Sequence, residues 1–352
     1  MQIEYRLSQR KESILDAIVR DYILHGEPLG SRTVMQRHGF TFSPATIRNE
    51  MADLEDAGLL SQPHTSAGRI PSQKGYRFFV DYLMQTYVPT SEEQQFVRRL
   101  QQTSRAVEAV LAQAIRILSE ATQSIVIAET PRSQTYSVSR IELLLIDHAS
   151  VVLNLLYKNG LRRHSVLQLP HAVTAEALTL MTHYLNEQLQ RFVSIDVLFH
   201  RMVTRPLERE MMAYQQLLLD TISEIYAQIQ RDEKVFLSGT SYLLQEPEFQ
   251  SMEEAFPILS FLEKERVIHE LLHSCQNNDL QKSHNVYCLI GYENSYQELH
   301  NCSFIATPYY IDNKASGMIG VLGPTRMNYA KVMALLQSVA GNVTQSLSEL
   351  FG

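Results

Sequence analysis

Residues 269–273 combine two histidines and a glutamate at a spacing that suits zinc chemistry. The segment reads HELLH, with Glu270 directly after His269 and with His273 as its last residue. On a helix this spacing places both imidazoles on one face, one turn apart, with the glutamate beside them as a general base. A chain of this composition is expected to contain about 0.03 such patterns by chance. Glu293 is available further along the chain as a third ligand.

The surroundings of this pattern favour an ordinary, partly exposed helix. Leu271 and Leu272 suit packing against a core, and Glu293 follows the strand-like segment VYCLIGY. The third ligand of such a zinc site normally lies on another helix. We therefore predict no metal, no cofactor and no catalytic residue in this chain. A zinc hydrolase built around His269 and His273 remains the alternative from a different functional class.

A second segment, residues 43–56, has the residue types that read DNA. Ser43 followed by Pro44 is typical of a helix start, and Ile47, Met51 and Leu54 recur at the spacing of one buried helical face. The opposite face carries small and hydrogen-bonding side chains. A helix in the major groove needs small residues where it approaches closely, and donors or acceptors that pair with base edges. The predicted base contacts are Ala45, Thr46, Arg48 and Asn49.

Polar and basic residues around this segment can contact the DNA backbone or the minor groove. SQRKESILDAIVRDYILHG and RTVMQRHG predict two preceding helices. LLSQPHTSAGRIP predicts a strand, a tight turn and a second strand, with Arg69 near the tip. Cationic side chains on such helices and hairpins bind phosphates or enter the minor groove. The predicted contacts of this kind are Lys11, Arg32, Arg37, His64, Thr65, Ser66 and Arg69.

The composition permits DNA binding without providing general affinity for DNA. The 352 residues carry a net charge of −7, whereas residues 1–85 hold 10 Lys/Arg and 10 Asp/Glu, so the acidity lies in the remainder. Phosphate binding must therefore depend on where individual cations are placed. Cys275, Cys288 and Cys302 form no C-x-x-C pair and indicate free thiols in a reducing compartment. With no signal peptide and no membrane-length apolar run, we expect a cytoplasmic protein.

The remaining residues predict an α+β body. A long amphipathic helix is predicted at 92–120, and the strand-like segments SRIELLLID and SVVLNLLYKNG then form a hairpin about the turn at 147–149. Helical patterns dominate 174–275, with one short strand, VFLSG, among them. Strands return from NVYCLIGYE to SGMIGVLGP before a final helix at 326–350. Strands on either side of a helix-rich stretch are typical of one α+β domain with an insertion.

Several of these segments resemble the HrcA-type heat-inducible transcription repressor family. The resemblance is carried by GEPLGSRT, SPATIRNEMADLEDAGLL and QPHTSAGRIPSQKGYRFFVDYLM, and later in the chain by FLSGTSYLL, GYEN and GVLGPTRMNY. It implies an α+β, multidomain architecture with three parts. These are an N-terminal winged helix-turn-helix domain at 1–87, a GAF-like α/β sheet domain at 92–190 and 283–352, and an inserted helix-rich dimerising domain at 191–282.

The resemblance also implies a function. The family represses heat-shock chaperone operons, binds double-stranded DNA at an inverted-repeat operator as a homodimer, and is kept active by the chaperonin. Two reading helices related by a two-fold axis match such a palindromic operator. A winged-helix repressor that senses a metabolite in its GAF-like domain is the alternative within the same class.

Overall fold

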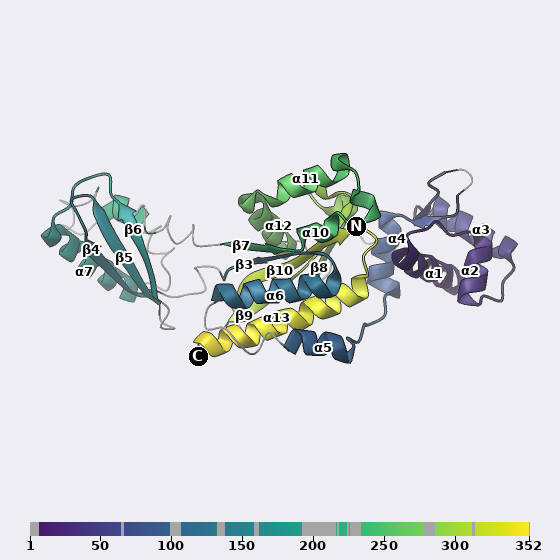
Figure 1. Cartoon of the computed structure of the whole chain (residues 1–352), viewed down its shortest axis with the longest axis horizontal. Helices are drawn as coiled ribbons and strands as arrows, with labels where there is room; N and C mark the ends of the chain where they lie inside the picture. The colour runs from purple at the N-terminus through teal and green to yellow at the C-terminus, as the bar shows by residue number, and fades with distance from the viewer. Residues whose placement is uncertain are drawn as a thin grey trace.

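The computed structural model describes residues 7–64, 67–98, 107–131, 138–157, 162–191, 216, 218–223, 225, 234–277, 286–311 and 314–351. In these ranges the chain is a multidomain α+β protein, as expected (Figure 1). An N-terminal helical unit is followed by a central five-stranded sheet covered by helices and by a separate three-stranded sheet. No helix in these ranges combines the length and the apolar character needed to cross a lipid bilayer.

The N-terminal unit contains three helices, a short hairpin and a fourth helix. Its elements are α1 (Gln9–His25), α2 (Ser31–His38), α3 (Pro44–Asp56), β1 (Leu60–Ser61), β2 (Ile70–Pro71) and α4 (Gln73–Phe78), which continues as a π-helical turn, Phe79–Leu83. The side chains of Ser8, Ser43 and Ser72 cap α1, α3 and α4 by accepting hydrogen bonds from backbone amides. α1 and α2 end at Gly26 and Gly39, whose φ angles of 69° and 65° favour glycine.

One apolar core holds the first three helices together. Ile14, Leu15 and Ile18 of α1 share this core with Ile47 and Leu54 of α3, and all five side chains are fully buried. Helical spacing places these residues on inward faces. The predicted inward face of α3 is therefore confirmed.

The central unit is a five-stranded antiparallel sheet between two helical layers. Its strands are β3 (Ile125–Glu129), β7 (Val235–Ser238), β8 (Tyr287–Ile290), β9 (Cys302–Ile311) and β10 (Lys314–Pro324), in the spatial order β7-β3-β10-β9-β8. One face is covered by α6 (Val107–Thr122) and α13 (Tyr329–Phe351), with α5 (Ser91–Arg98) beside α13 (Figure 1). The other face carries α10 (Thr240–Leu243), α11 (Met252–Leu262) and α12 (Glu265–Asn277).

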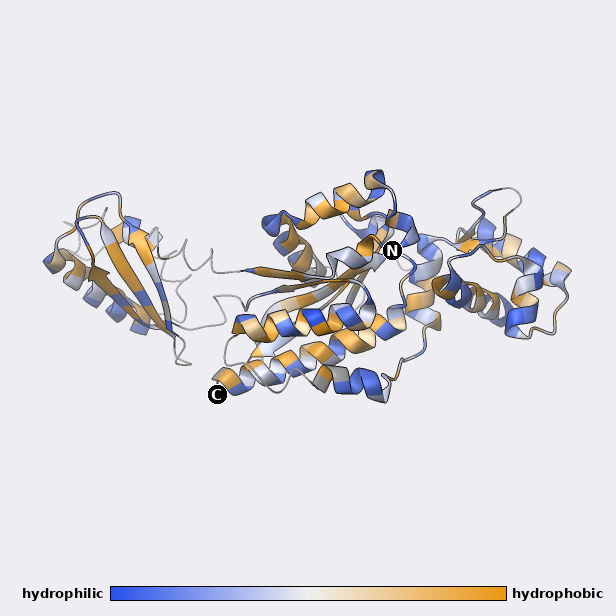
Figure 2. Cartoon of the chain, in the orientation of Figure 1, coloured by the Kyte–Doolittle hydropathy of each residue, from blue (hydrophilic) through white to orange (hydrophobic). Residues whose placement is uncertain are grey.

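The two helical layers use alternate residues of the same strands. Val126 and Ala128 of β3 belong to the core shared with α6 and α13, whereas Ile125 and Ile127 belong to the core shared with α11 and α12. Successive side chains of a strand point to opposite faces, so a strand buried on both faces must be apolar along this run. Figure 2 shows hydrophobic strands lying between helices that have one hydrophobic and one hydrophilic side.

The third unit is an antiparallel sheet with its own helix. Its elements are β4 (Val138–Leu145), β5 (Ser150–Tyr157), β6 (Arg162–Gln168) and α7 (Ala175–Arg191). Asp147 closes the turn between β4 and β5 by accepting hydrogen bonds from the amides of Ala149 and Ser150, so the predicted hairpin is confirmed. β5 alternates buried and half-buried residues because α7 packs against one face of this sheet.

The division between two sheets differs from the predicted domain boundaries. The family resemblance implies that residues 138–168 belong to the GAF-like domain, but β4, β5 and β6 pair with one another, and no strand in the described ranges joins them to the central sheet. The resemblance likewise implies that residues 235–277 belong to the insertion, but they supply β7 and the layer of α10, α11 and α12 to the central sheet. β3 pairs with β10 and β7, which are far away in the sequence, and a local hydrophobic pattern does not identify a distant partner.

Candidate nucleic-acid interface

The outer side of α3 is open to solvent. The Ser43 hydroxyl accepts a hydrogen bond from the Thr46 amide at 3.1 Å and so caps the helix. Ala45, Arg48 and Asn49 are exposed, whereas Thr46 is half-buried and its hydroxyl lies 2.9 Å from that of Ser43. The structure thus brings three of the four predicted base-contacting residues together on one exposed face. The fourth, Thr46, belongs to the helix cap.

Two arginines, one on this face and one on the neighbouring helix α2, have exposed side chains. Neither Arg32 on α2 nor Arg48 on α3 forms an ion pair within the part of the chain that the structure describes. His64, at the turn of the hairpin, is exposed as well, while Thr65 and Ser66 lie outside the described residues. A guanidinium that is not bound to a carboxylate keeps all its donors for a phosphate or for the edge of a guanine.

Lys11 and Arg37 bind carboxylates of neighbouring helices. The ammonium of Lys11 lies 2.9 Å from Asp53 on α3, and this hydrogen bond raises the pKa of Lys11. Arg37 Nη1 lies 2.6 Å from Asp21 on α1. The Asp21 carboxylate is only 4% exposed and also lies 3.2 Å from His38 Nε2. Because a buried carboxylate needs such partners, Arg37 helps to hold α2 against α1, whereas Lys11 pairs with the exposed Asp53 and links α1 to α3 at the surface.

Arg69 lies at the base of the hairpin and not near its tip. Its backbone pairs with that of Leu29 in both directions, at 3.0 and 2.8 Å. Its guanidinium binds Glu55 of α3 through Nε at 2.8 Å and Nη2 at 2.7 Å. At Gly68 a Cβ atom would lie 2.3 Å from the Leu29 backbone. The pairing with Leu29 fixes this position, and nothing in the hairpin sequence identifies that partner.

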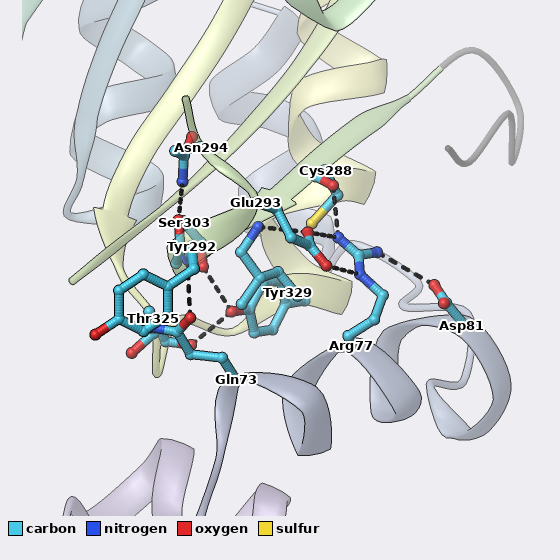
Figure 3. Close-up of polar contacts among 12 residues, drawn as sticks. Gln73, Arg77, Asp81, Cys288, Tyr292, Glu293, Asn294, Ser303, Thr325 and Tyr329 are labelled. Carbon is cyan, nitrogen blue, oxygen red and sulfur yellow. Dashed lines mark hydrogen bonds and ion pairs between the residues drawn. The ribbon is translucent and has the colours of Figure 1, made fainter. Parts of the chain in front are cut away.

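Sequence reasoning missed a polar junction between α4 and the central unit, which Figure 3 shows. Arg77 binds both carboxylate oxygens of Glu293 (Nε–Oε1 2.8 Å, Nη2–Oε2 2.5 Å) and donates to the carbonyl oxygen of Cys288 at 2.6 Å. It also lies 3.2 Å from Asp81. Burial is the largest single influence and lowers the pKa of Arg77, but the hydrogen bond with Glu293 and the charges around the guanidinium together outweigh it, so the pKa is raised. The sequence offered one signal for this junction: the motif QKGYRF contains Arg77, and the motif GYEN contains the oppositely charged Glu293.

Gln73 adds a second set of contacts to this junction. Its side-chain nitrogen donates to the His300 carbonyl oxygen at 2.9 Å, and its side-chain oxygen accepts a hydrogen bond from the Tyr292 amide at 2.8 Å (Figure 3). Gly291 leaves room for these contacts, because its φ angle is 54° and a Cβ atom there would lie 2.0 Å from the Gln73 side chain. Gln73 and His300, which are 227 positions apart in the sequence, therefore join the N-terminal unit to the central unit.

The HELLH segment lies on α12 and does not form the arrangement of a zinc hydrolase. Glu293, the candidate third ligand, binds Arg77 instead. Glu270, the candidate general base, accepts a hydrogen bond from the Tyr296 hydroxyl at 3.2 Å. The two histidines lie near Glu129 at the end of β3, a residue that the sequence pattern did not connect with them.

Two of the three cysteines are buried free thiols, as predicted. Cys288 and Cys302 form no disulfide, and burial raises the pKa of each to about 12. A thiol that stays protonated is a poor nucleophile and a poor metal ligand. The side chain of Cys275 lies outside the described residues.

Sequence relatives of this chain are described as heat-inducible transcription repressors. The model of the HrcA protein C-terminal domain matches residues 108–333. The heat-inducible transcription repressor HrcA of Moorella thermoacetica is 37% identical over 350 residues, which cover 98% of this chain and 99% of the relative. The repressor of the same name from Halalkalibacterium halodurans is 36% identical over 349 residues, with coverage of 98% and 99%. A crystal structure of a hypothetical protein has a similar fold, with a TM-score of 0.62 and 19% identity over 98% of this chain and 100% of that chain. The chain therefore belongs to the HrcA family of heat-inducible transcription repressors.

Proposed function

We propose that this repressor reads its operator with α3, in a winged helix whose wing is the β1–β2 hairpin, and binds an inverted repeat as a homodimer. The observation that carries this proposal is the outer face of α3. Ala45, Arg48 and Asn49 are exposed there together, opposite the buried side chains of Ile47 and Leu54. Small residues allow close approach to base edges, asparagine pairs with adenine, and arginine pairs with guanine.

The distribution of charge supports a dimer. Lys11, Arg37 and Arg69 are engaged with carboxylates, whereas Arg32 and Arg48 form no ion pair in the described ranges. A unit with few free cations neutralises few phosphates and binds DNA weakly. Two such units on one protein bind a two-fold symmetric operator together, because binding of the first unit holds the second one close to its half-site.

We infer that the dimer contact lies on the open face of the three-stranded sheet. Leu144, Val152 and Val166 are direct cross-strand neighbours on this face. Leu144 and Val166 are 55% and 52% exposed, and neighbouring exposed apolar side chains favour an interface. The unit at 138–191 then takes the dimerising role, and the central sheet with its helices takes the role of the GAF-like domain.

Sedimentation of the full chain tests this dimer contact. The double variant Leu144→Lys/Val166→Lys should sediment as a monomer at a concentration at which the unaltered chain is a dimer. Leu180→Lys is the matched control, because Leu180 is similarly exposed but lies on α7. A double variant that remains a dimer would move the interface to another surface.

Operator binding by fluorescence anisotropy tests the reading face. Asn49→Ala should weaken binding to DNA from upstream of the chaperone operons by about 1–3 kcal/mol, or roughly 5- to 160-fold, with little effect on random DNA. Gln190→Ala, an exposed amide on α7, is the matched control and should change neither affinity. If Asn49→Ala leaves both affinities unchanged, α3 does not read the operator through this face.

The salt dependence of the same binding reaction separates base contacts from phosphate contacts. Arg32→Ala should weaken binding to operator and random DNA alike and reduce the slope of log K against log salt by about one unit. Asn49→Ala should leave that slope unchanged, because an amide neutralises no phosphate. An unchanged slope in Arg32→Ala would show that Arg32 does not contact the DNA backbone.

We also propose that the chaperonin keeps the repressor active by assisting its folding. The contacts that join the units are long-range, such as that of Gln73 with His300 across 227 positions. Folding slows as contacts join more distant residues, and intermediates of large chains expose apolar surface. Refolding from urea with chaperonin and ATP should raise the fraction of protein that binds operator, with serum albumin as the control protein. An equal active fraction with and without chaperonin would remove this proposal.

A further inference from the structure

We propose that Glu129, His269 and His273 form a binding site for a divalent transition-metal ion of the zinc type. Glu129 is the last residue of β3, and both histidines lie on α12. One nitrogen of each imidazole and one carboxylate oxygen all lie within 4.8 Å of one another. The proposed operator-binding face of α3 is in a different unit, so this site does not depend on the proposed mode of DNA binding.

The distances among the ligand atoms suit tetrahedral coordination. His269 Nδ1 lies 3.3 Å from Glu129 Oε2, and His273 Nε2 lies 3.7 Å from the same oxygen. Ligand atoms that each lie about 2.0–2.1 Å from a tetrahedral zinc ion are roughly 3.3 Å apart. The two imidazole rings are nearly parallel, with centroids 6.3 Å apart and an angle of 16°, and one nitrogen of each ring lies near the same Glu129 oxygen.

The elements that carry the ligands are held firmly. Ile268, Leu271 and Leu272 are buried and fix α12 against the central sheet. The carbonyl oxygen of Glu129 accepts a hydrogen bond from the Tyr309 hydroxyl at 2.8 Å, and the residue pairs with Val235 in the sheet. A metal site placed on a strand and a packed helix keeps its geometry better than a site built on loops.

Burial and ligand type favour a cation at this position. The Glu129 side chain is only 2% exposed, whereas His269 and His273 are 19% and 34% exposed. A carboxylate so far from water needs positive charge close to it. Two imidazoles and one carboxylate are a ligand set that zinc prefers, with water as the usual fourth ligand at sites of this kind.

The site binds a metal but lacks the general base of a hydrolase. Glu270, the glutamate of the HELLH segment, is engaged by the Tyr296 hydroxyl and by Arg266. The bound ion would instead join α12 to the end of β3, close to the point where the chain leaves the central sheet for the unit at 138–191. Its effect is therefore structural: binding to the folded state stabilises that state in proportion to the logarithm of the metal concentration.

Titration of the metal-stripped full chain with Zn²⁺ alone, in competition with a chelating dye, tests the proposal. We expect one tightly bound ion per chain. Loss of a residue that only orients a metal ligand typically weakens metal binding by roughly 10- to 100-fold. His269→Gln and His273→Gln each remove a ligand itself, so each should weaken Zn²⁺ binding by more than this. His183→Gln is the matched control, because His183 lies 3.8 Å from Glu187 on the surface of α7 without a third ligand in the described ranges. It should bind Zn²⁺ like the unaltered chain.

A second measurement needs no variant and so does not depend on how the variants fold. Co²⁺ added to the unaltered, metal-stripped chain should give the intense visible bands of tetrahedral cobalt, and Zn²⁺ should abolish them. The histidine variants lack these bands, while a circular dichroism spectrum confirms that they are folded. If the unaltered chain shows no such bands, or if it binds no more Zn²⁺ than the His269→Gln/His273→Gln variant, the three residues form an ion pair only and the proposal is overturned.

Discussion

Replacing Arg77 by methionine should loosen the junction between the N-terminal unit and the central sheet. Methionine keeps the unbranched aliphatic stem but removes the two hydrogen bonds to Glu293 and the one to the Cys288 carbonyl oxygen. The Arg77 side chain is 16% exposed and that of Glu293 is 36% exposed. The Glu293 carboxylate therefore remains partly hydrated after the change, and the loss should fall below that of a fully buried pair.

The expected cost is about 2–4 kcal/mol. Breaking a fully buried ion pair costs about 3–5 kcal/mol, and a hydrogen bond to a charged group contributes about 1.5–3 kcal/mol. Solvent around Glu293 lowers the cost of breaking the ion pair, while the lost hydrogen bond to the Cys288 carbonyl oxygen adds to the total cost. At about 1.4 kcal/mol for each factor of ten, the junction should open roughly 30- to 700-fold more often. Arg77→Lys should recover less than half of this, because an ammonium cannot bind a carboxylate in the forked geometry.

Native-state hydrogen exchange measured by mass spectrometry reports this opening directly. The amide of Ile290 donates to Glu293, and that of Tyr292 donates to Gln73, so peptides covering residues 287–294 should exchange faster by the stated factor. Arg116→Met is the matched control, because Arg116 forms an exposed pair with Glu120 at 3.9 Å and should change these rates little. If Arg77→Met accelerates exchange less than about threefold, or no more than Arg116→Met does, the ion pair does not hold the units together and the energetic argument fails.

Three further changes have defined outcomes. Gly291→Ala forces a side chain into the amide of Gln73 and should cost about 1–3 kcal/mol in urea unfolding, most of which disappears in a Gln73→Ala background. Ser43→Ala removes the cap of α3 and should cost about 1 kcal/mol in the unfolding of the N-terminal unit. Burial raises the pKa of Glu93, but hydrogen bonds from a backbone amide and from Lys331 lower it to about 2. Because the folded pKa lies below the ordinary value, Glu93 stabilises the fold above about pH 4.5 and this contribution is lost as the pH falls toward 2. Thermal unfolding between these pH values should show that loss, and Lys331→Met should reduce it.

Local features of the fold could be predicted from the sequence because short-range physics determines them. Gly26 and Gly39 end their helices through a left-handed backbone conformation, and Ser43 starts α3 through its side-chain oxygen. The exposed face of α3 followed in the same way, since a helix with Ile47 and Leu54 inside must turn Ala45, Arg48 and Asn49 outward. Whether that face binds DNA remains a prediction.

Partners that lie far apart in the sequence could not be predicted in this way. Arg69 was expected near a hairpin tip, but it pairs with Leu29 and Glu55. Glu293 was weighed as a metal ligand, but it binds Arg77 from another unit. In both cases the side chain is charged and can bind any group of opposite charge that the fold brings within reach.

The sequence by itself determined the family, the sites where helices begin and end, and the exposed face of α3, because each depends on residues within a few turns of one another. Only the tertiary structure decided which strands share a sheet, and so which segments build the central unit. It alone brought Glu129 to His269, which is 140 positions away along the chain, and to His273 one helical turn further on. The reason is the same in each case: sheet pairing and ion pairing act through space, and a hydrophobic or charged pattern along the chain specifies the kind of partner but not its position.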